Sequence, residues 1–384
     1  MFARSSSEFG LELYGRLAAQ PCDVAFSPFG IATAFTMAWA GARGATADQM
    51  KRVLHLDGSP PEVLPASGKL LANLQDQRHN VRLAIVNRLF AERSYPVERD
   101  YLDALATAYS SAPLEPVSFR AKPEMARIEI NGWLEQQTEG RIRDLVLPGD
   151  IDRQTRIVLV NVLDFIGEWA DPFPPDRTGD RTFYPRNRPA KNVTTMTQVG
   201  TFRIGRVADV RVLELCYKSR QMAMIFALTD STDALPAFEK RLDLRELDAL
   251  VASLRPLRAE IAVPRFELRP GSFSLAEELS RLGMTDAFDD VRADFTAMAN
   301  RPDPEDRLFI SKALHGAFVE VNEQETRAAA ATVVHVLRLG SAPNEEIETF
   351  KINRPFLFFI RDGASGAVLF MGRIEDPSLC QRSA

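Results

Sequence analysis

Side chains able to carry out covalent or metal chemistry are sparse in this chain of 384 residues. The candidates are four histidines and three cysteines: His55, His79, His315, His335, Cys22, Cys216 and Cys380. They form no His-Glu-x-x-His or Cys-x-x-Cys pattern, and the chain has no phosphate-cradling glycine loop and no nucleophile elbow. The cysteines are too few and too scattered for a disulfide framework, so we expect free thiols. The sequence therefore predicts no enzyme, no catalytic or metal-binding residue and no cofactor.

The stretch from Asn322 to Thr332 indicates a function that depends on backbone conformation and not on reactive side chains. It reads Asn-Glu-Gln-Glu-Thr-Arg-Ala-Ala-Ala-Ala-Thr and lies between two apolar segments near the C-terminus. Alanine favours helix, and a short exposed helix is one interpretation of the first half. The β-branched residues from Thr332 to Val336 favour a strand instead.

Taken as a strand, this stretch has one face without large or charged residues. That face carries Thr326, Ala328, Ala330, Thr332, Val334 and Val336. The opposite face carries Arg327, Ala329, Ala331, Val333, His335 and Leu337. Successive strand residues point to opposite faces, and these residues would span roughly 40 Å. The segment could therefore enter a sheet between two existing strands, with its small neutral face on the core.

Composition narrows the class of protein. Apolar residues make up 45% of the chain, enough for a sizeable core. The net charge of −5 and pI of about 5.6 give no nucleic-acid footprint. No apolar run reaches transmembrane length. The N-terminal residues lack the apolar region of a signal peptide, so we expect either a cytoplasmic protein or a secreted one whose signal was removed.

Hydrophobic periodicity predicts helices and strands in irregular order. Expected helices are 6–20, 31–41, 45–56, 124–138 and one near 236–255. Expected strands are 24–28, 81–90, 157–163 and several more between 200 and 263. The run 157–163 is apolar except for Asn161, as suits a strand buried on both faces. Because helices and strands do not alternate regularly, the sequence indicates an α+β fold.

Several segments, in order along nearly the whole chain, carry a family resemblance. They are Phe26-Ser27-Pro28, Asn87-Arg88-Leu89-Phe90, Asn131-Gly132-Trp133, Leu159-Val160-Asn161, Arg354-Pro355-Phe356 and Phe370-Met371-Gly372-Arg373. Together with the alanine tract, they resemble the serpins. The resemblance implies one domain over residues 1–384, with a large mixed central sheet, two further sheets, about nine helices and an exposed reactive-centre loop near 323–345.

The resemblance also implies a function and a set of partners. The chain is expected to be a monomeric suicide-substrate inhibitor of serine proteases, with cysteine proteases also open as partners. No nucleic acid, membrane or cofactor is expected, and no helix carries the clustered lysines and arginines that a heparin-type cofactor needs. A non-inhibitory serpin that acts as a carrier or chaperone is the alternative.

Site residues follow from matching the family's motifs. The hinge would consist of Glu323, Glu325, Thr326, Ala328, Ala329, Ala330, Ala331 and Thr332. The gate that keeps the sheet closed would consist of Ser27, Asn161, Trp169, Arg265 and His315. Three positions depart from the usual pattern: Glu325 replaces glycine, Arg327 is an unusual base, and Gly30 replaces a second serine. Glu325 could slow insertion, since glycine tolerates strained backbone angles.

The cleaved bond is expected near the far end of the loop. Inhibitory serpins usually place it thirteen residues beyond the hinge threonine, which from Thr326 gives Leu339, followed by Gly340. Leu339 would fit the apolar pocket of a chymotrypsin-like or elastase-like protease. Cleavage between Arg338 and Leu339 would instead suit a trypsin-like pocket, whose buried acid binds a base.

Overall fold

The apolar run around Asn161 forms a strand in the middle of the molecule. In the computed structural model this strand is β4 (Ile157–Gly167), and its first nine residues are buried. The structure describes residues 1–19, 22–76, 81–109, 114–268, 273–300, 306–323 and 347–379. Burial on both faces explains why this strand is almost continuously apolar, as the sequence predicted.

The central sheet has six strands of mixed direction. Its order is β10-β12-β4-β2-β3, and β11 also pairs with β12. The strands parallel to each other are β12 with β4 and β2 with β3, whereas β2 is antiparallel to β4. The bounds besides those of β4 are β2 Val81–Glu92, β3 Leu114–Val117, β10 Phe266–Leu268, β11 Phe273–Ser274 and β12 Ile310–Val321.

The remaining described strands form one hydrogen-bonded network of nine. Its order is β1-β15-β14-β8-β7-β6-β9-β13, with β5 paired to β6. Their bounds are β1 Val24–Phe26, β5 Gly179–Phe183, β6 Lys191–Val207, β7 Val210–Cys216, β8 Met222–Thr229, β9 Arg255–Pro264, β13 Glu348–Lys351, β14 Phe356–Asp362 and β15 Val368–Ile374. The long strand β6 joins two regions, because its first residues pair with β5 and its last with β7. The strands expected as two further sheets are thus linked through β6.

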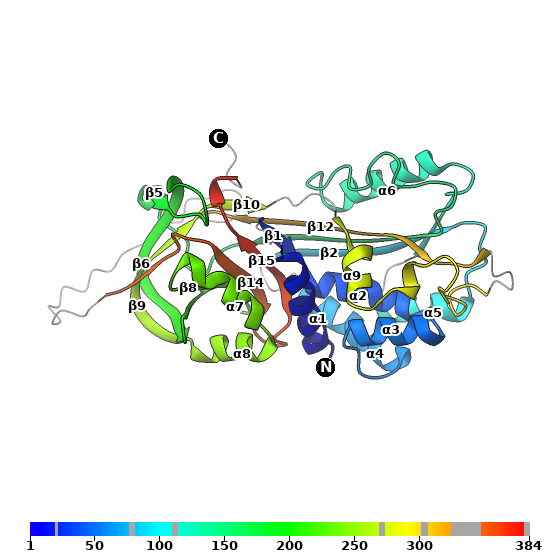
Figure 1. Ribbon diagram of the computed structural model, residues 1–384, viewed down its shortest axis with the longest axis horizontal. Coiled ribbons are helices and arrows are strands. Elements are labelled where there is room, and N and C mark those ends of the chain that lie inside the picture. The colour runs from blue at the N-terminus through cyan, green and yellow to red at the C-terminus, as the bar shows by residue number, and fades with distance from the viewer. Residues whose placement is uncertain are drawn as a thin grey trace.

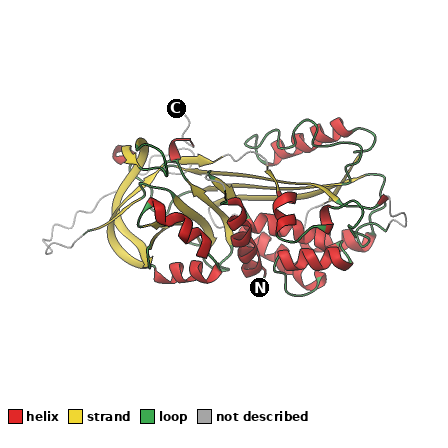
Figure 2. Ribbon diagram, viewed as in Figure 1, coloured by secondary structure: helices red, strands yellow, loops and turns green. Residues whose placement is uncertain are grey.

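Nine α-helices occur among the described residues, and they lie unevenly about the central sheet. Figure 1 shows α2, α3 and α4 on one face and α6 alone on the other, and the helices drawn in red in Figure 2 have the same distribution. The bounds are α1 Phe2–Leu17, α2 Pro28–Ala40, α3 Gly44–Val53, α4 Pro60–Leu74, α5 Arg99–Tyr109, α6 Pro123–Gln137, α7 Leu235–Arg241, α8 Leu244–Ser253 and α9 Leu275–Arg281.

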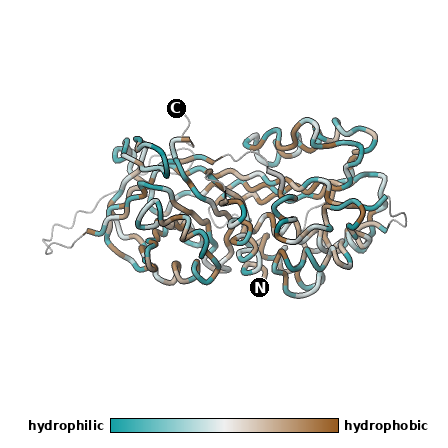
Figure 3. The backbone as a smooth tube through the Cα atoms, in the orientation of Figure 1, coloured by the Kyte–Doolittle hydropathy of each residue, from teal (hydrophilic) through white to brown (hydrophobic). Residues whose placement is uncertain are grey.

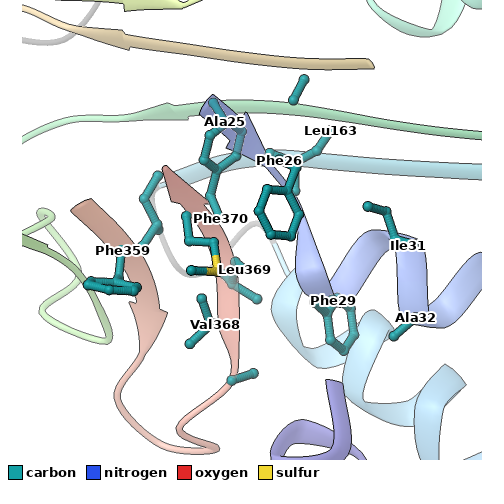
Figure 4. Close-up of a cluster of buried hydrophobic side chains, with 14 of the residues drawn as sticks. Ala25, Phe26, Phe29, Ile31, Ala32, Leu163, Phe359, Val368, Leu369 and Phe370 are labelled. Carbon is teal, nitrogen blue, oxygen red and sulfur yellow. The ribbon is translucent and has the colours of Figure 1, made fainter. Parts of the chain in front are cut away.

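The main core lies between the central sheet and α2. Figure 4 shows side chains of β1, α2, β4 and β15 in one cluster, among them Phe26, Phe29, Leu163 and Phe370, all fully buried. Each such phenylalanine contributes roughly 1.5–3 kcal/mol through burial. A second cluster packs α6 on the opposite face of the sheet through Val158, Val160 and Val162. Hydrophobic residues follow the sheet strands through the molecule in Figure 3.

The prediction of one helix near 236–255 is wrong. The segment forms α7 and α8, separated by Leu242, whose backbone is extended. Asp243 is the N-cap residue of α8, and its carboxylate accepts a hydrogen bond from the backbone N–H of Glu246 at 2.8 Å. An aspartate that caps a helix stabilises a break that hydrophobic periodicity does not reveal.

No helix in the described ranges is both long and apolar enough to cross a membrane.

Close helix packing generates a prediction at Gly68 of α4. A Cβ atom there would lie 1.8 Å from the carbonyl oxygen of Ala108 in α5. The backbone of α4 or of α5 would have to shift to make room for it. We expect Gly68→Ala to lower the free energy of unfolding of the intact protein by about 1–3 kcal/mol, measured with denaturant.

Gly132 of α6 is the matched control, because a Cβ atom there meets nothing within 4 Å. Gly132→Ala should raise stability by about 0.5–1 kcal/mol, since alanine favours helix. Equal effects of the two substitutions would contradict the packing argument.

Candidate functional site

The site begins with the closed contact between β12 and β4. The two strands pair directly, from Ile310 opposite Ile157 to Val319 opposite Phe165. His315 stands opposite Asn161 in the middle of this ladder. The position where an additional strand would enter the sheet is therefore closed in this structure.

Ser27 connects the start of α2 to this ladder. Its hydroxyl accepts a hydrogen bond from the backbone N–H of Gly30 at 2.9 Å, so it caps the helix, and Pro28 follows at the first helical position. The hydroxyl also donates to the carbonyl oxygen of Leu369 at 2.7 Å. Ser27 is fully buried, and both functions of its hydroxyl are satisfied.

His315 completes the contact between α2 and the two strands. The backbone N–H of Ser27 donates to Nε2 of His315 at 3.1 Å, which makes that nitrogen the acceptor. Nδ1 then carries the proton and donates to Oδ1 of Asn161 at 2.6 Å. The ring is only 1% exposed, and burial lowers the pKa of His315 to about 3. The imidazole is therefore neutral at physiological pH.

Asn87 of β2 is a further member of the cluster, which the sequence analysis did not include. Nδ2 of Asn161 donates to Oδ1 of Asn87. Asn87 is the one amide in the period-two series Leu83, Ile85, Asn87, Leu89, a signal that could have identified it. The hydrogen-bonded network thus spans β12, β4 and β2.

Gly30 fits this cluster for a steric reason. A Cβ atom at Gly30 would lie 2.6 Å from Nδ2 of Asn161 and 2.8 Å from Oγ of Ser27. The volume that a serine side chain would need is thus occupied by these two side chains. The side chains of Asn161 and Ser27 therefore fill the space beside Gly30, where the family pattern has a serine.

Glu323 lies two residues after the end of β12 and is the last residue of the described range 306–323. Hydrogen bonds hold it in place. Its carbonyl oxygen accepts from the backbone N–H of Phe173 at 2.9 Å. Its carboxylate accepts from Thr178 Oγ1 at 2.6 Å and from Arg265 Nε at 2.8 Å. The Glu323 side chain is 7% exposed and that of Arg265 is 44% exposed. Direct attraction in such a half-exposed pair is modest, but an unpaired buried carboxylate would cost about 1–3 kcal/mol or more.

Trp169 binds the backbone of Asn322, the residue before Glu323. Its indole Nε1 donates to the carbonyl oxygen of Asn322 at 2.8 Å. The indole stacks on the ring of Tyr217, with centroids 4.8 Å apart and planes at 9°. Thr178 and Tyr217 were not predicted, because nothing local to them indicates a contact with a distant glutamate or tryptophan.

The segment between α6 and β4 crosses the same strand pair on the opposite face. A Cβ atom at Gly316 of β12 would contact Leu145 at 3.1 Å and Ile142 at 3.5 Å. The side chain of Asn131 in α6 forms two hydrogen bonds to the backbone of Val146. This connector (residues 138–156) therefore covers the β12–β4 contact from the side of α6.

The structure thus brings Ser27, Asn161 and His315 together, and separately Trp169, Arg265 and Glu323. The other predicted residues lie outside the described ranges: Glu325, Thr326, Ala328, Ala329, Ala330, Ala331, Thr332, Arg338, Leu339 and Gly340. Of the cysteines, Cys22 and Cys216 are free. Within the described residues no group of His, Cys, Asp and Glu could hold a metal ion.

Comparison with known proteins gives a consistent result. Residues 4–377 match the family model described as Serpin (serine protease inhibitor). The chain belongs to the serpin family. A leukocyte elastase inhibitor of Bos taurus is 37% identical over 363 residues, which are 92% of this chain and 93% of that protein. Serpin B3 of Homo sapiens is 34% identical over 374 residues, 92% of this chain and 94% of that protein.

Solved structures confirm the α+β serpin fold predicted from the sequence. The crystal structure of uncleaved ovalbumin superimposes with a TM-score of 0.88 at 28% identity, covering 98% of this chain and 100% of that chain. Membership in the serpin family also confirms the resemblance drawn from the sequence motifs.

Burial of His315 generates a pH prediction. The pKa is about 3 in the folded protein and 6.5 in an unperturbed histidine, so the unfolded state binds more protons between these values. The free energy of unfolding must then fall as pH falls through this window. We expect this contribution to amount to about 1.4 kcal/mol per pH unit.

The measurement is denaturant unfolding of the intact protein at several values between pH 6 and pH 4. His315→Gln keeps an amide in the network but does not titrate, so its stability should depend less steeply on pH by that amount. Parallel slopes for wild type and variant would mean that His315 does not lose a proton on folding.

Proposed function

We propose that this chain inhibits serine proteases as a suicide substrate. The proposal depends mainly on the direct pairing of β12 with β4. The alanine-rich tract follows β12 in the sequence. The last described residue of that connection, Glu323, is anchored by Thr178 and Arg265. A closed sheet beside a chain segment with a small, neutral face supports insertion of that segment as a new strand.

The mechanism is a competition between two fates of one intermediate. The protease nucleophile attacks the loop and forms an acyl-enzyme. Cleavage frees the hinge segment, which inserts between β12 and β4 and carries the attached protease to the far pole. Distortion of the protease active site then prevents hydrolysis. The driving force is a metastable intact fold, which a kinetic barrier keeps from converting to the inserted form before cleavage.

We propose Leu339–Gly340 as the cleaved bond and an elastase-like or chymotrypsin-like protease as the target. The names of the leukocyte elastase inhibitors among the relatives agree with an apolar residue at this position. Cleavage at Arg338–Leu339 by a trypsin-like protease is the alternative. A cysteine protease is also compatible, because it forms the same kind of acyl-enzyme.

The gate and hinge assignments, and the single domain over residues 1–384, belong to the same proposal. The family match from residue 4 to residue 377 supports one domain. A non-inhibitory carrier or chaperone remains the second candidate, and Glu325 is the observation that favours it. The small residues from Ala328 to Thr332 favour inhibition, because bulky or charged residues in the hinge would oppose insertion.

The test is to incubate the protein with elastase, chymotrypsin, trypsin and subtilisin and to analyse the products on denaturing gels. We expect an SDS-stable complex with elastase or chymotrypsin, and a C-terminal peptide that begins at Gly340. A peptide that begins at Leu339 would establish the trypsin-like bond. Cleavage without any complex would contradict the inhibitory function and favour the carrier or chaperone.

Thr326→Arg provides a direct prediction for insertion. Thr326 lies on the face that must turn toward the core, and burying an unpaired guanidinium there costs several kcal/mol. The variant should be cleaved at the same bond but should form little or no complex. Thr326→Val, which is small and neutral, should still form the complex. Undiminished inhibition by Thr326→Arg would contradict insertion.

A further inference from the structure

The connector (residues 138–156) is bound to both strands between which an additional strand would enter. On the β12 side, Nζ of Lys312 donates to Oδ1 of Asp150 at 3.3 Å, and both of these side chains are partly exposed. On the β4 side, Nη1 of Arg141 donates to Oδ2 of Asp164 at 2.7 Å. The exposed pair contributes little, because water screens it. The contact with Asp164 is therefore the stronger of the two ion pairs.

The connector lies in direct contact with the strand pair that it covers. A Cβ atom at Gly316 of β12 would lie 3.1 Å from Leu145 and 3.5 Å from Ile142. An entering strand would add about 4.8 Å to the width of the sheet, and every second side chain of it would point toward the connector. The connector must therefore lift before a strand can enter, and lifting separates Arg141 from Asp164.

Asp164 is a charged residue in an otherwise apolar series of β4. It continues the series Val158, Val160 and Val162, which packs in the cluster of α6, and it is fully buried. Removing one partner of a buried ion pair is strongly destabilising, because the remaining charge is left without water. As long as the connector covers Asp164, its carboxylate therefore depends on Arg141.

The carboxylate of Asp164 is only partly satisfied while it is covered. Its Oδ1 has no hydrogen-bond partner among the described residues. A second guanidinium, that of Arg82 in β2, has Nη2 at 3.9 Å from Oδ2. Burial raises the pKa of Asp164 even though Arg141 and Arg82 lower it. The closed state thus holds a charge whose desolvation is incompletely offset, and water would relieve it once the connector lifts.

The start of the connector holds a strained residue. Glu139 has φ of 49° and Gly140 has φ of 76°, and a left-handed backbone is unfavourable for a glutamate. Nη1 of Arg82 donates to Oε2 of Glu139 at 2.7 Å. The connector therefore begins at a strained residue bound to β2, two residues before its bond to β4 through Arg141.

We propose that the Arg141–Asp164 pair is a latch, which holds the connector on the sheet and sets the rate at which a strand can enter. Asp164 is a positioning residue, because it acts through Arg141. Opening exchanges a buried, incompletely bonded carboxylate for a hydrated one. The latch therefore delays opening without preventing it.

This inference rests on the proposed function, since the entry of a strand is the step that the latch controls. A weak latch would let the sheet open before cleavage, and intact inhibitor would be lost by spontaneous conversion. A tight latch would delay insertion, and the protease would hydrolyse the acyl-enzyme first. The strength of one ion pair thus affects both the lifetime of the inhibitor and its efficiency.

The first experiment measures backbone hydrogen exchange of the intact chain and requires no protease. It compares wild type with Arg141→Gln, which leaves the carboxylate of Asp164 without its donor, and with Arg141→Lys, which keeps a charge. We expect amides of residues 139–147 to exchange about tenfold faster in Arg141→Gln, from the loss of one charge-assisted hydrogen bond. Arg141→Lys should remain close to wild type.

Arg143 provides the matched control in the same connector. Its Nε lies 3.0 Å from Oε1 of Glu135, and the two side chains are 66% and 49% exposed. Arg143→Gln should leave exchange unchanged, because an exposed pair contributes little. Amides of β14 and β15 report global unfolding. If they accelerate as much as those of the connector in Arg141→Gln, the substitution only destabilises the fold and the latch is refuted.

The second experiment measures the limiting rate of complex formation at saturating protease. Arg141→Gln should raise this rate by about tenfold, since the closed state loses the same bond. The intact variant should also lose inhibitory activity faster on warming. In the Asp164→Asn background the effect of Arg141→Gln should largely disappear, because the charge that needs the guanidinium is gone.

The outcomes separate the two proposals. If the wild type forms no complex with elastase, chymotrypsin, trypsin or subtilisin, the proposed function is wrong, and control of strand entry is refuted with it. Hydrogen exchange then decides whether the pair holds the connector. If the wild type forms a complex but Arg141→Gln exchanges and reacts like wild type, only the latch is refuted. Additive effects of Arg141→Gln and Asp164→Asn would also refute it, since Arg141 would then act through another partner.

Discussion

The parallel ladder between β12 and β4 is the contact on which the rest of the structure depends. Parallel pairs are slightly less stable per residue than antiparallel ones. A strand that entered between these two by a hairpin from β12 would run antiparallel to both. One parallel ladder would then be replaced by two antiparallel ladders. Insertion would therefore leave the sheet in a more stable arrangement than the closed one.

Two layers of contacts hold this ladder closed from opposite faces. On the core face, His315, Asn161 and Ser27 connect both strands to the start of α2. On the other face, Leu145 and Ile142 of the connector cover Gly316. Burial shifts the pKa values on the two faces in opposite directions: it lowers the pKa of His315 and raises that of Asp164. Lowering the pH therefore reduces the contribution of His315 to the free energy of unfolding and increases that of Asp164.

Much of this arrangement follows from local sequence patterns, and the exceptions have identifiable causes. The run 157–163 predicts a strand buried on both faces, and Asn161 within it marks a polar contact. The break between α7 and α8 depends on a capping aspartate, which hydrophobic periodicity does not register. Thr178 and Tyr217 contact residues far away in the sequence, so no local pattern could identify them. Asn87 differs, since an amide in an apolar period-two series was visible beforehand.

The position of β13, β14 and β15 in the nine-stranded network has a consequence for the molecule after cleavage. The chain beyond the loop pairs with β9 through β13 and with β8 through β14. Most side chains of β14 and all those of β15 are buried. A break between residues 324 and 346 therefore does not free the C-terminal segment. A protein cleaved there would consist of two fragments held together by the pairing of β13 with β9 and of β14 with β8.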